Sequence, residues 1–220
     1  MNKTMATRRD FIRNTLVAAA AFPLLTSCGF DATAQKVGDD VLTLIRKNAV
    51  NDPSSNWTGA KDVPNSVSWT TTLSTETDMG EPMLISGTVF KSDRKTPAPN
   101  TLIYLYHTDF EGYYGRKKDE HRHGRYRGWL LTDDKGRYEF RSIKPAPYPE
   151  NRWAAHIHMT LTGIGFREDS IDSILFEGDR LISPQERSSA GQKGGFNPIL
   201  TFKKGKDDVL RATRNIQLMT

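Results

Sequence analysis

The sequence has little cysteine and lacks a long apolar run, and both shortages narrow the class of protein. Cys28 is the only cysteine among the 220 residues, so the chain forms no internal disulfide. The apolar run Leu16–Leu25 is too short for a convincing membrane span. A phosphate-binding glycine loop, a serine triad motif and an internal repeat are also missing from the sequence.

The charge of the chain is not that of a nucleic-acid-binding domain. The formal net charge is +5 and the pI is about 9.3, which would suit an acidic partner. Residues 1–27 alone hold four basic side chains and one acidic one, however, so the rest of the chain carries only +2. We therefore expect no basic face for nucleic acid.

The first residues resemble an export signal. The stretch "TRRDFIR" is similar to the twin-arginine export motif, and "LTSC" is similar to a bacterial lipobox that ends at Cys28. A plain amphipathic helix with a chance arginine pair is the alternative. We expect a signal peptide over 1–27, a lipid on Cys28 and a protein anchored to a membrane in the periplasm or cell envelope. The twin-arginine route generally carries proteins that are already folded, often with their cofactor bound.

Residues 28–79 are predicted to form a tether, a short helix and an irregular segment. In "GDDVLTLIRK", Asp39 or Asp40 lies near an expected N-cap, and Asn51–Asp52–Pro53 would end the helix. The next residues carry an apolar stripe at helical spacing that we expect to pack on the domain. The stripe consists of Val41, Leu42, Leu44 and Ile45.

Residues 80–220 are predicted to form one all-β domain. Short runs rich in β-branched and aromatic residues follow one another, and turn signals such as "DDKG" and "KGKDD" separate them. This succession predicts a β-sandwich of short, mostly antiparallel strands. The expected strands lie within 83–90, 101–108, 128–133, 137–143, 154–163, 173–179, 199–205 and 209–218.

Two of the five histidines stand one residue apart, in the apolar run "AAHIHMTLTG". Side chains at i and i+2 of a strand leave the same face, so His156 and His158 would point together. Two adjacent imidazoles are a start for a metal site, although two satisfied strand histidines are the ordinary alternative. A second pair, His121 and His123, lies in the charged stretch "GRKKDEHRHGRYRG" and is expected in a solvated loop.

The surroundings of His156 and His158 resemble a known family. "TDFEGYYGR", "YRGWLLTDDKGRYEFRSIKPAPYP", "AAHIH" and "LFEGD" follow one another in the sequence. In this order they are similar to the motifs of the intradiol ring-cleavage dioxygenases of the catechol and protocatechuate type. The resemblance covers roughly residues 80–185, and several short motifs agree in order and spacing.

The resemblance implies a non-haem Fe(III) site formed by long loops and a strand, with ligands Tyr114, Tyr148, His156 and His158. Ferric iron is a hard acid that favours phenolate oxygen. The substrates would be a small aromatic diol and O2, and the ring would open between its two hydroxyl-bearing carbons. Tyr148 would leave the metal when the diol binds and would act as a catalytic base. Tyr126 and Tyr138 are expected to be core or surface aromatics.

The sequence departs from the family near the expected substrate. Typical members have an arginine where this chain has Trp153, and Arg152 stands one residue earlier. Arg152 is either the catalytic cation, presented by a shorter loop, or a surface charge. If it is a surface charge, Arg125 or Arg127 would be the candidate for the catalytic cation. Trp153, Ser173 and Tyr113 are predicted to bind substrate, and Tyr113 is otherwise a packed aromatic.

Two other functions are compatible with the sequence. The chain could be a lipoprotein on the same fold that keeps the metal or binds a phenolic ligand but has lost turnover. A zinc hydrolase built on His156 and His158 is less well supported, because it leaves the matching tyrosines unexplained. A homo-oligomer is left open.

Overall fold

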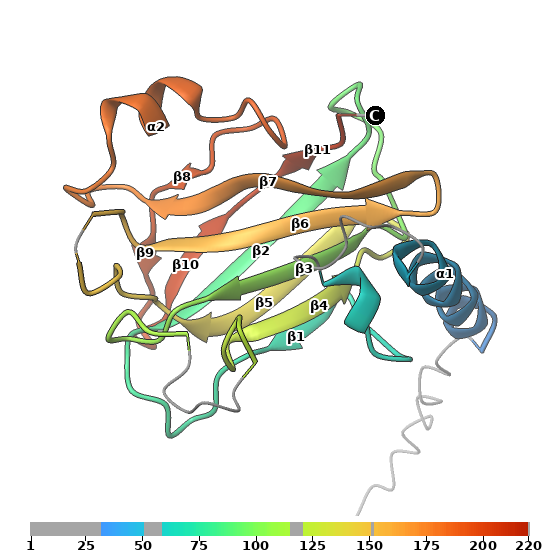
Figure 1. The fold of residues 1–220 in the computed structure, drawn as a ribbon, viewed down its shortest axis with the longest axis horizontal. Helices are drawn as coiled ribbons and strands as arrows, with labels where there is room; N and C mark the ends of the chain where they lie inside the picture. The colour runs from blue at the N-terminus through green and yellow to red at the C-terminus, as the bar shows by residue number, and fades with distance from the viewer. Residues whose placement is uncertain (1–31, 51–58, 115–120, 151, 220) are drawn as a thin grey trace, which may run out of the picture.

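The computed structural model consists of two β-sheets packed face to face, with a long helix against one of them (Figure 1). It describes residues 32–50, 59–114, 121–150 and 152–219. The expected signal peptide and Cys28 lie outside these residues.

Within the described ranges, the first sheet has the order β1-β5-β2-β10-β9, and β11 also pairs with β2. The second sheet has the order β4-β3-β6-β7-β8. The strands of the first sheet are β1 (Thr70–Thr72), β2 (Pro82–Phe90), β5 (Arg137–Ile143), β9 (Lys203–Lys204), β10 (Leu210–Thr213) and β11 (Ile216–Gln217). Those of the second sheet are β3 (Leu102–His107), β4 (Arg127–Leu131), β6 (His156–Gly163), β7 (Phe166–Phe176) and β8 (Ile199–Leu200).

The all-β sandwich predicted from the sequence is confirmed. The long ladders β2–β5, β3–β4, β3–β6 and β6–β7 are antiparallel. Parallel pairing occurs in the short ladders β1–β5, β10–β2, β11–β2 and β7–β8. Strand β6 is the middle strand of the second sheet, so neighbours hold it on both sides.

The core between the sheets follows from the alternation of side chains along each strand. Ile157 and Met159 of β6 are 0% and 1% exposed, and they pack in the same cluster as Ile85 and Phe140 of the first sheet. Tyr138 also lies in this core, where its hydroxyl donates to the carbonyl of Arg214 at 2.6 Å. The side chains that alternate with the core residues of β6 are left on the outer face of the second sheet.

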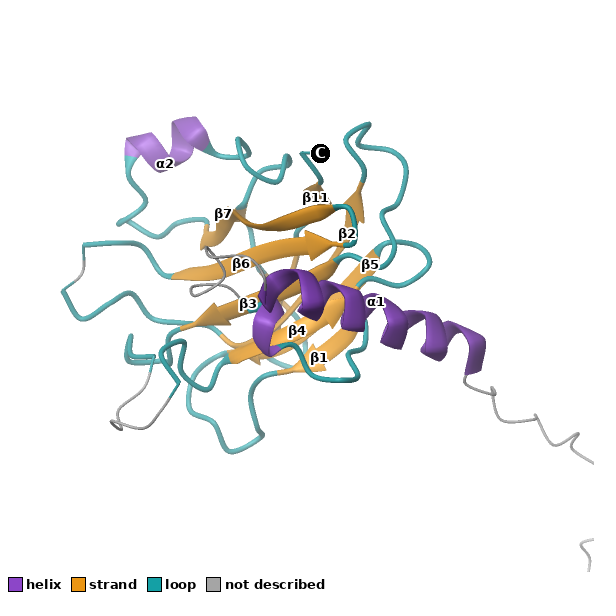
Figure 2. Ribbon diagram, turned by 45° about the vertical axis from the view of Figure 1, so that its right-hand side comes forward, coloured by secondary structure: helices purple, strands orange, loops and turns teal. Residues whose placement is uncertain are grey.

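Helix α1 (Ala32–Val50) lies against the outer face of the second sheet (Figure 2). Val41, Leu42 and Ile45 are buried in one cluster with residues of β3 and β4, whereas Leu44 is 44% exposed. The described helix runs to Val50, and the predicted stop at Asn51–Asp52–Pro53 lies outside the described residues. An N-cap at Asp39 or Asp40 is wrong, because the helix already begins at Ala32. None of the described helices is long and apolar enough to cross a membrane.

The described part of the segment after the helix contains two short elements, the 3-10 turn η2 (Ala60–Asp62) and strand β1. The carboxylate of Glu168 accepts hydrogen bonds from the backbone N–H groups of Gly59 (2.9 Å) and Ala60 (2.8 Å). The indole of Trp129 donates to the carbonyl of Gly59 at 2.7 Å. A side chain at Gly59 would collide with the ring of Tyr104, so only glycine allows this close approach.

Candidate metal centre

Strand β6 presents two imidazoles side by side on its outer face. His156 and His158 are half-buried, while Ile157 between them is fully buried in the core. The Nε2 atoms of the two histidines lie 3.0 Å apart. The same-face arrangement expected from the spacing is therefore present.

Contacts at the other ring nitrogens orient both imidazoles. Nδ1 of His156 donates to the carbonyl of Ala154 at 2.7 Å, so Nε2 of neutral His156 is a bare acceptor. Nδ1 of His158 lies 3.3 Å from the hydroxyl of Ser173, and its ring stacks on Tyr106 with centroids 4.6 Å apart. Burial, and then the neighbouring His156, lowers the pKa of His158 to about 3. Neutral imidazoles held this way are suited to binding a metal through Nε2.

Two tyrosines from separate loops complete a group of four donors. The hydroxyl of Tyr148 lies 3.3 Å from Nε2 of His156 and 2.8 Å from the hydroxyl of Tyr114. Burial, and then the hydrogen bond with Tyr148, raises the pKa of Tyr114. In the protein alone Tyr114 is therefore a neutral phenol, and a nearby cation is needed to stabilise its phenolate.

Glycines let the tyrosine loops approach their neighbours. Gly124 has a φ of +66°, and a Cβ there would collide with the carbonyl of Tyr114. Gly112 has a φ of +90°, and a Cβ there would collide with the carbonyl of Pro147, next to Tyr148. Both positions need the left-handed backbone that glycine adopts easily.

The distances between successive donors are compatible with a small metal ion. Two donors about 2 Å from one ion and 90–120° apart are separated by roughly 2.8–3.5 Å. The three separations along the chain Tyr114–Tyr148–His156–His158 are 2.8, 3.3 and 3.0 Å. Among the described residues, no group of three or more His, Cys, Asp or Glu side chains is placed to hold a metal. A metal at the histidine pair would therefore need the phenols as further ligands.

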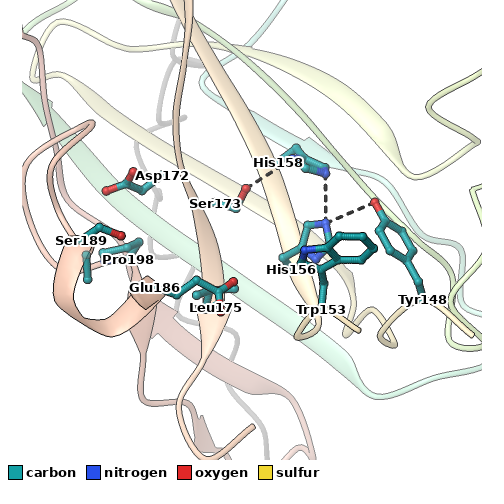
Figure 3. A pocket seen from close by; sticks show the side chains of 11 residues that line it. Tyr148, Trp153, His156, His158, Asp172, Ser173, Leu175, Glu186, Ser189 and Pro198 are labelled. Carbon is teal, nitrogen blue, oxygen red and sulfur yellow. Dashed lines mark hydrogen bonds between the residues drawn. The ribbon is translucent and has the colours of Figure 1, made fainter. Parts of the chain in front are cut away.

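A pocket of about 380 Å³ opens beside these donors. Its volume is in the range of sites for small ligands. Figure 3 shows Tyr148, Trp153 and the two histidines on one side, Asp172 and Glu186 on the other, and Ser173 between them. The lining residues are Tyr148, Trp153, His156, His158, Asp172, Ser173, Leu175, Glu186, Ser189, Ala190 and Pro198.

The predicted substrate-binding residues are only partly brought together. Trp153 and Ser173 line the pocket, and the Trp153 ring, 55% exposed, meets the edge of Tyr148 at 6.2 Å and 79°. Tyr113 is 45% exposed and is not among the lining residues. Arg152 is exposed and outside the lining as well. Of the substitute cations, Arg125 is already paired with Asp78.

The prediction of a solvated loop around His123 is wrong. His123 is 6% exposed, its Nδ1 lies 2.7 Å from the hydroxyl of Tyr104, and its ring stacks on Tyr106 at 3.8 Å and 2°. Burial lowers its pKa to about 4. The alternation in "LIYLYH" places Tyr104 and Tyr106 on one face, and these rings give His123 an aromatic environment despite its charged neighbours in sequence. His121 is less buried.

Sequence reasoning missed the two acids of the pocket. Asp172 precedes Ser173 on β7, and Glu186 lies in helix α2 (Pro184–Ser189). Glu186 could have been recognised only as part of the "SPQE" capping box, which the structure contains. Nothing in the sequence shows that α2 folds over the pocket.

Comparison with known proteins identifies the class to which this fold and site belong. A family model described as "Dioxygenase" matches residues 60–195. The protocatechuate 3,4-dioxygenase beta chain of Burkholderia cepacia is 33% identical over 115 residues, which cover 48% of each chain. A chlorocatechol 1,2-dioxygenase of Pseudomonas putida is 31% identical over 123 residues, or 49% of this chain and 46% of the relative. The chain thus spans about half the length of the curated relatives it matches.

Solved structures share the fold. The crystal structure of chlorocatechol 1,2-dioxygenase from Pseudomonas putida aligns with a TM-score of 0.52 at 23% identity, covering 83% of this chain and 81% of that one. Catechol 1,2-dioxygenase from Pseudomonas arvilla C-1 aligns with a TM-score of 0.52 at 16% identity, covering 84% and 74%. The chain belongs to the intradiol ring-cleavage dioxygenase family.

Proposed function

We propose that this protein is a non-haem Fe(III) intradiol dioxygenase. Its substrate would be a catechol-type ring, which opens between the two hydroxyl-bearing carbons as both atoms of O2 enter the product. The observation that carries the proposal is the convergence of two phenolic oxygens and two imidazole nitrogens beside one pocket. Family membership supports the same reaction class.

The donor set suits ferric iron better than zinc. Tyr114, Tyr148, His156 and His158 offer two oxygens that become anionic beside a cation and two neutral nitrogens. Two phenolates and a hydroxide would balance the three charges of the ion. Ferric iron held there would supply Lewis acidity toward the catechol oxygens and make the ring reactive toward O2.

Residues of the chain would orient the substrate and move its protons. The Tyr148 hydroxyl lies between Tyr114 and His156 and next to the pocket. As the phenolate that a bound cation would stabilise, its oxygen would accept a proton from an incoming catechol and become the neutral phenol. Trp153 would form an apolar wall for the flat ring. Arg152 remains our candidate for stabilising negative charge on the ring, although it does so only if its loop turns toward the pocket.

Iron loading followed by turnover tests the proposal. We expect about one iron per chain, a visible tyrosinate-to-iron absorption band, and O2 uptake with catechol that yields a ring-opened diacid. With isotopically labelled O2, both labels should enter the product. A colourless protein that takes up zinc in preference to iron would contradict the metal assignment. A coloured protein that never consumes O2 would instead identify a metal-retaining binding protein.

We also propose that the protein is exported by the twin-arginine route and anchored through a lipid on Cys28. The proposal rests on "TRRDFIR" and "LTSC". Folding before export would let the metal be inserted in the cytoplasm, since the site needs two loops and a strand to come together.

A further inference from the structure

The far side of the pocket carries two acidic side chains, Asp172 and Glu186. Resting on the proposed function, we propose that Glu186 and Asp172 make this site specific for catechols without an acidic substituent, neutral or cationic, and exclude carboxylate-bearing catechols. Glu186 is the main determinant. This assigns a specificity role to two residues that neither bind the metal nor take part in the chemistry.

The two carboxylates face the donors across the pocket. Figure 3 shows His156, His158 and Tyr148 on one side and the side chains of Asp172 and Glu186 on the other. A catechol bound through its two oxygens at the donor side would direct substituents on the opposite ring carbons toward the carboxylates. A substituent at that position therefore experiences their charge directly.

Backbone and side-chain hydrogen bonds hold one oxygen of each carboxylate. Oε2 of Glu186 accepts from both the backbone N–H and the hydroxyl of Ser183, each at 2.7 Å. Oδ2 of Asp172 accepts from the N–H groups of Gly191 (2.8 Å) and Lys193 (3.1 Å). In the part of the chain that the structure describes, no hydrogen bond reaches the second oxygen of either group. Each acid is thus fixed in place with an oxygen left to interact with a ligand.

The two carboxylates differ in how far neighbouring basic residues offset their negative charge. No lysine or arginine is among the described residues that line the pocket. The nearby Arg187 pairs with Glu177, and Lys193 pairs with Asp169. Asp172 interacts with the buried guanidinium of Arg214 and opposes the lowering of its pKa by burial. Within the described ranges, no lysine or arginine forms an ion pair with Glu186. Glu186 is therefore the stronger repulsive group.

The remaining lining suits an uncharged ring. Leu175, Ala190, Pro198 and the ring of Trp153 contribute apolar surface. The hydroxyls of Ser173 and Ser189 and the indole N–H of Trp153 are neutral hydrogen-bonding groups. An anionic substituent would lose water without gaining a cationic partner, which costs free energy. An ammonium group would gain an ion pair with Glu186 instead.

Three ligands of matched size test the inference. They are 3,4-dihydroxybenzoate, 3,4-dihydroxybenzamide and 3,4-dihydroxybenzylamine, which are anionic, neutral and cationic at their substituent. For iron-loaded protein we expect the amide to exceed the benzoate by about tenfold or more in kcat/KM, and the amine to equal or exceed the amide. Calorimetric Kd values should follow the same order, with the difference shrinking at high salt.

Variants assign the effect to the two acids. Glu186→Gln keeps an acceptor for the capping box and should narrow the amide-to-benzoate ratio to within about threefold. Asp172→Asn should narrow it less. The exposed Asp169→Asn is the matched control, because it removes an acid of the same strand outside the pocket, and it should leave the ratio unchanged. Comparing each variant with the wild type cancels the intrinsic reactivity of the three rings.

The outcomes separate this inference from the proposed function. If catechols are turned over and the benzoate is as good a substrate as the amide, the charge selection is refuted while the dioxygenase stands. If no catechol is turned over, the dioxygenase proposal fails and the Kd order still decides the inference. The charge selection is also refuted if neither Glu186→Gln nor Asp172→Asn changes the amide-to-benzoate ratio of kcat/KM.

Discussion

Nε2 of His156 lies 3.0 Å from Nε2 of His158, and in neutral His156 this nitrogen is the acceptor because Nδ1 donates to the carbonyl of Ala154. An unprotonated nitrogen that also lies 3.3 Å from the Tyr148 hydroxyl is well placed for a shared cation. This relationship connects the strand to the tyrosine loops and motivates the first prediction.

Replacing the phenols should remove the metal. In Tyr114→Phe or Tyr148→Phe the site loses one anionic oxygen, so we expect iron affinity to fall at least tenfold. Metal content after dialysis against a chelator and the intensity of the visible band measure this. Tyr126→Phe, a buried tyrosine outside the donor group, should retain both. If both variants retained iron fully, the two tyrosines would not be metal ligands.

Gly124→Ala should disturb the site without touching a ligand. The added Cβ would collide with the carbonyl of Tyr114, and the φ of +66° disfavours any other residue. We expect weaker iron binding and a shifted visible band, together with a loss of stability of about 1–3 kcal/mol. Gly165→Ala is the control, since a Cβ there meets nothing within 4 Å. If Gly124→Ala matched Gly165→Ala in iron binding, visible band and stability, the loop at Gly124 would accommodate the added Cβ without strain.

Buried His107 should make the folded state sensitive to acid. Its Nδ1 donates to the carbonyl of Thr108 and its Nε2 accepts from the Ser142 hydroxyl, both at 2.7 Å. Burial lowers its pKa to about 4 from an ordinary value near 6.5. The folded state therefore binds the proton less well than the unfolded chain. The stabilisation is complete above pH 6.5 and is lost as the pH falls toward 4.

Urea unfolding at pH 7 and pH 5 measures this effect. The free energy of unfolding should drop by about 2 kcal/mol more for the wild type than for His107→Gln. Glutamine offers one donor and one acceptor but does not titrate. An equal drop in both proteins would assign the acid sensitivity to other histidines.

Arg152→Ala separates metal binding from turnover. The residue is exposed and is not among the pocket-lining residues, so iron content and colour should be unchanged. If the guanidinium turns toward the ring during the reaction, kcat should fall about tenfold or more with a smaller change in KM. Arg152→Lys, which keeps the charge but not the planar group, should recover only part of the rate. Unchanged kcat and KM in Arg152→Ala would show that Arg152 is a surface charge without a role in turnover.

Cys28→Ser should release the protein from the membrane. Without the thiol no lipid can be attached, so the chain should move from the membrane fraction to the soluble one. Mass spectrometry of the wild-type mature N-terminus should show a lipidated Cys28. An unmodified N-terminus elsewhere in the chain would contradict the anchor.

The sequence predicted the sandwich and the pairing of the two imidazoles because both depend on short-range patterns, whereas Tyr114 and Tyr148 were assigned from the resemblance to the family. Alternation marks strand faces, and the spacing of His156 and His158 places two imidazoles on one of them. The packing of α2 over the pocket and the burial of His123 depend on contacts between distant segments, which no local pattern encodes. The start of α1 was misplaced because Asp39 and Asp40 resemble a cap while the helix continues through them.

Two of the four donors stand on a strand and two on loops, and this difference affects how a metal would enter and leave. His156 and His158 stand on the middle strand of a sheet, and the residues between and after them are core residues. Tyr114 and Tyr148 stand on loops. Local opening can move the loops while the strand stays protected, so their amides should exchange hydrogen long before those of β6. Metal entry and exit would then take place through the tyrosine side, with the histidines held as a fixed half of the site.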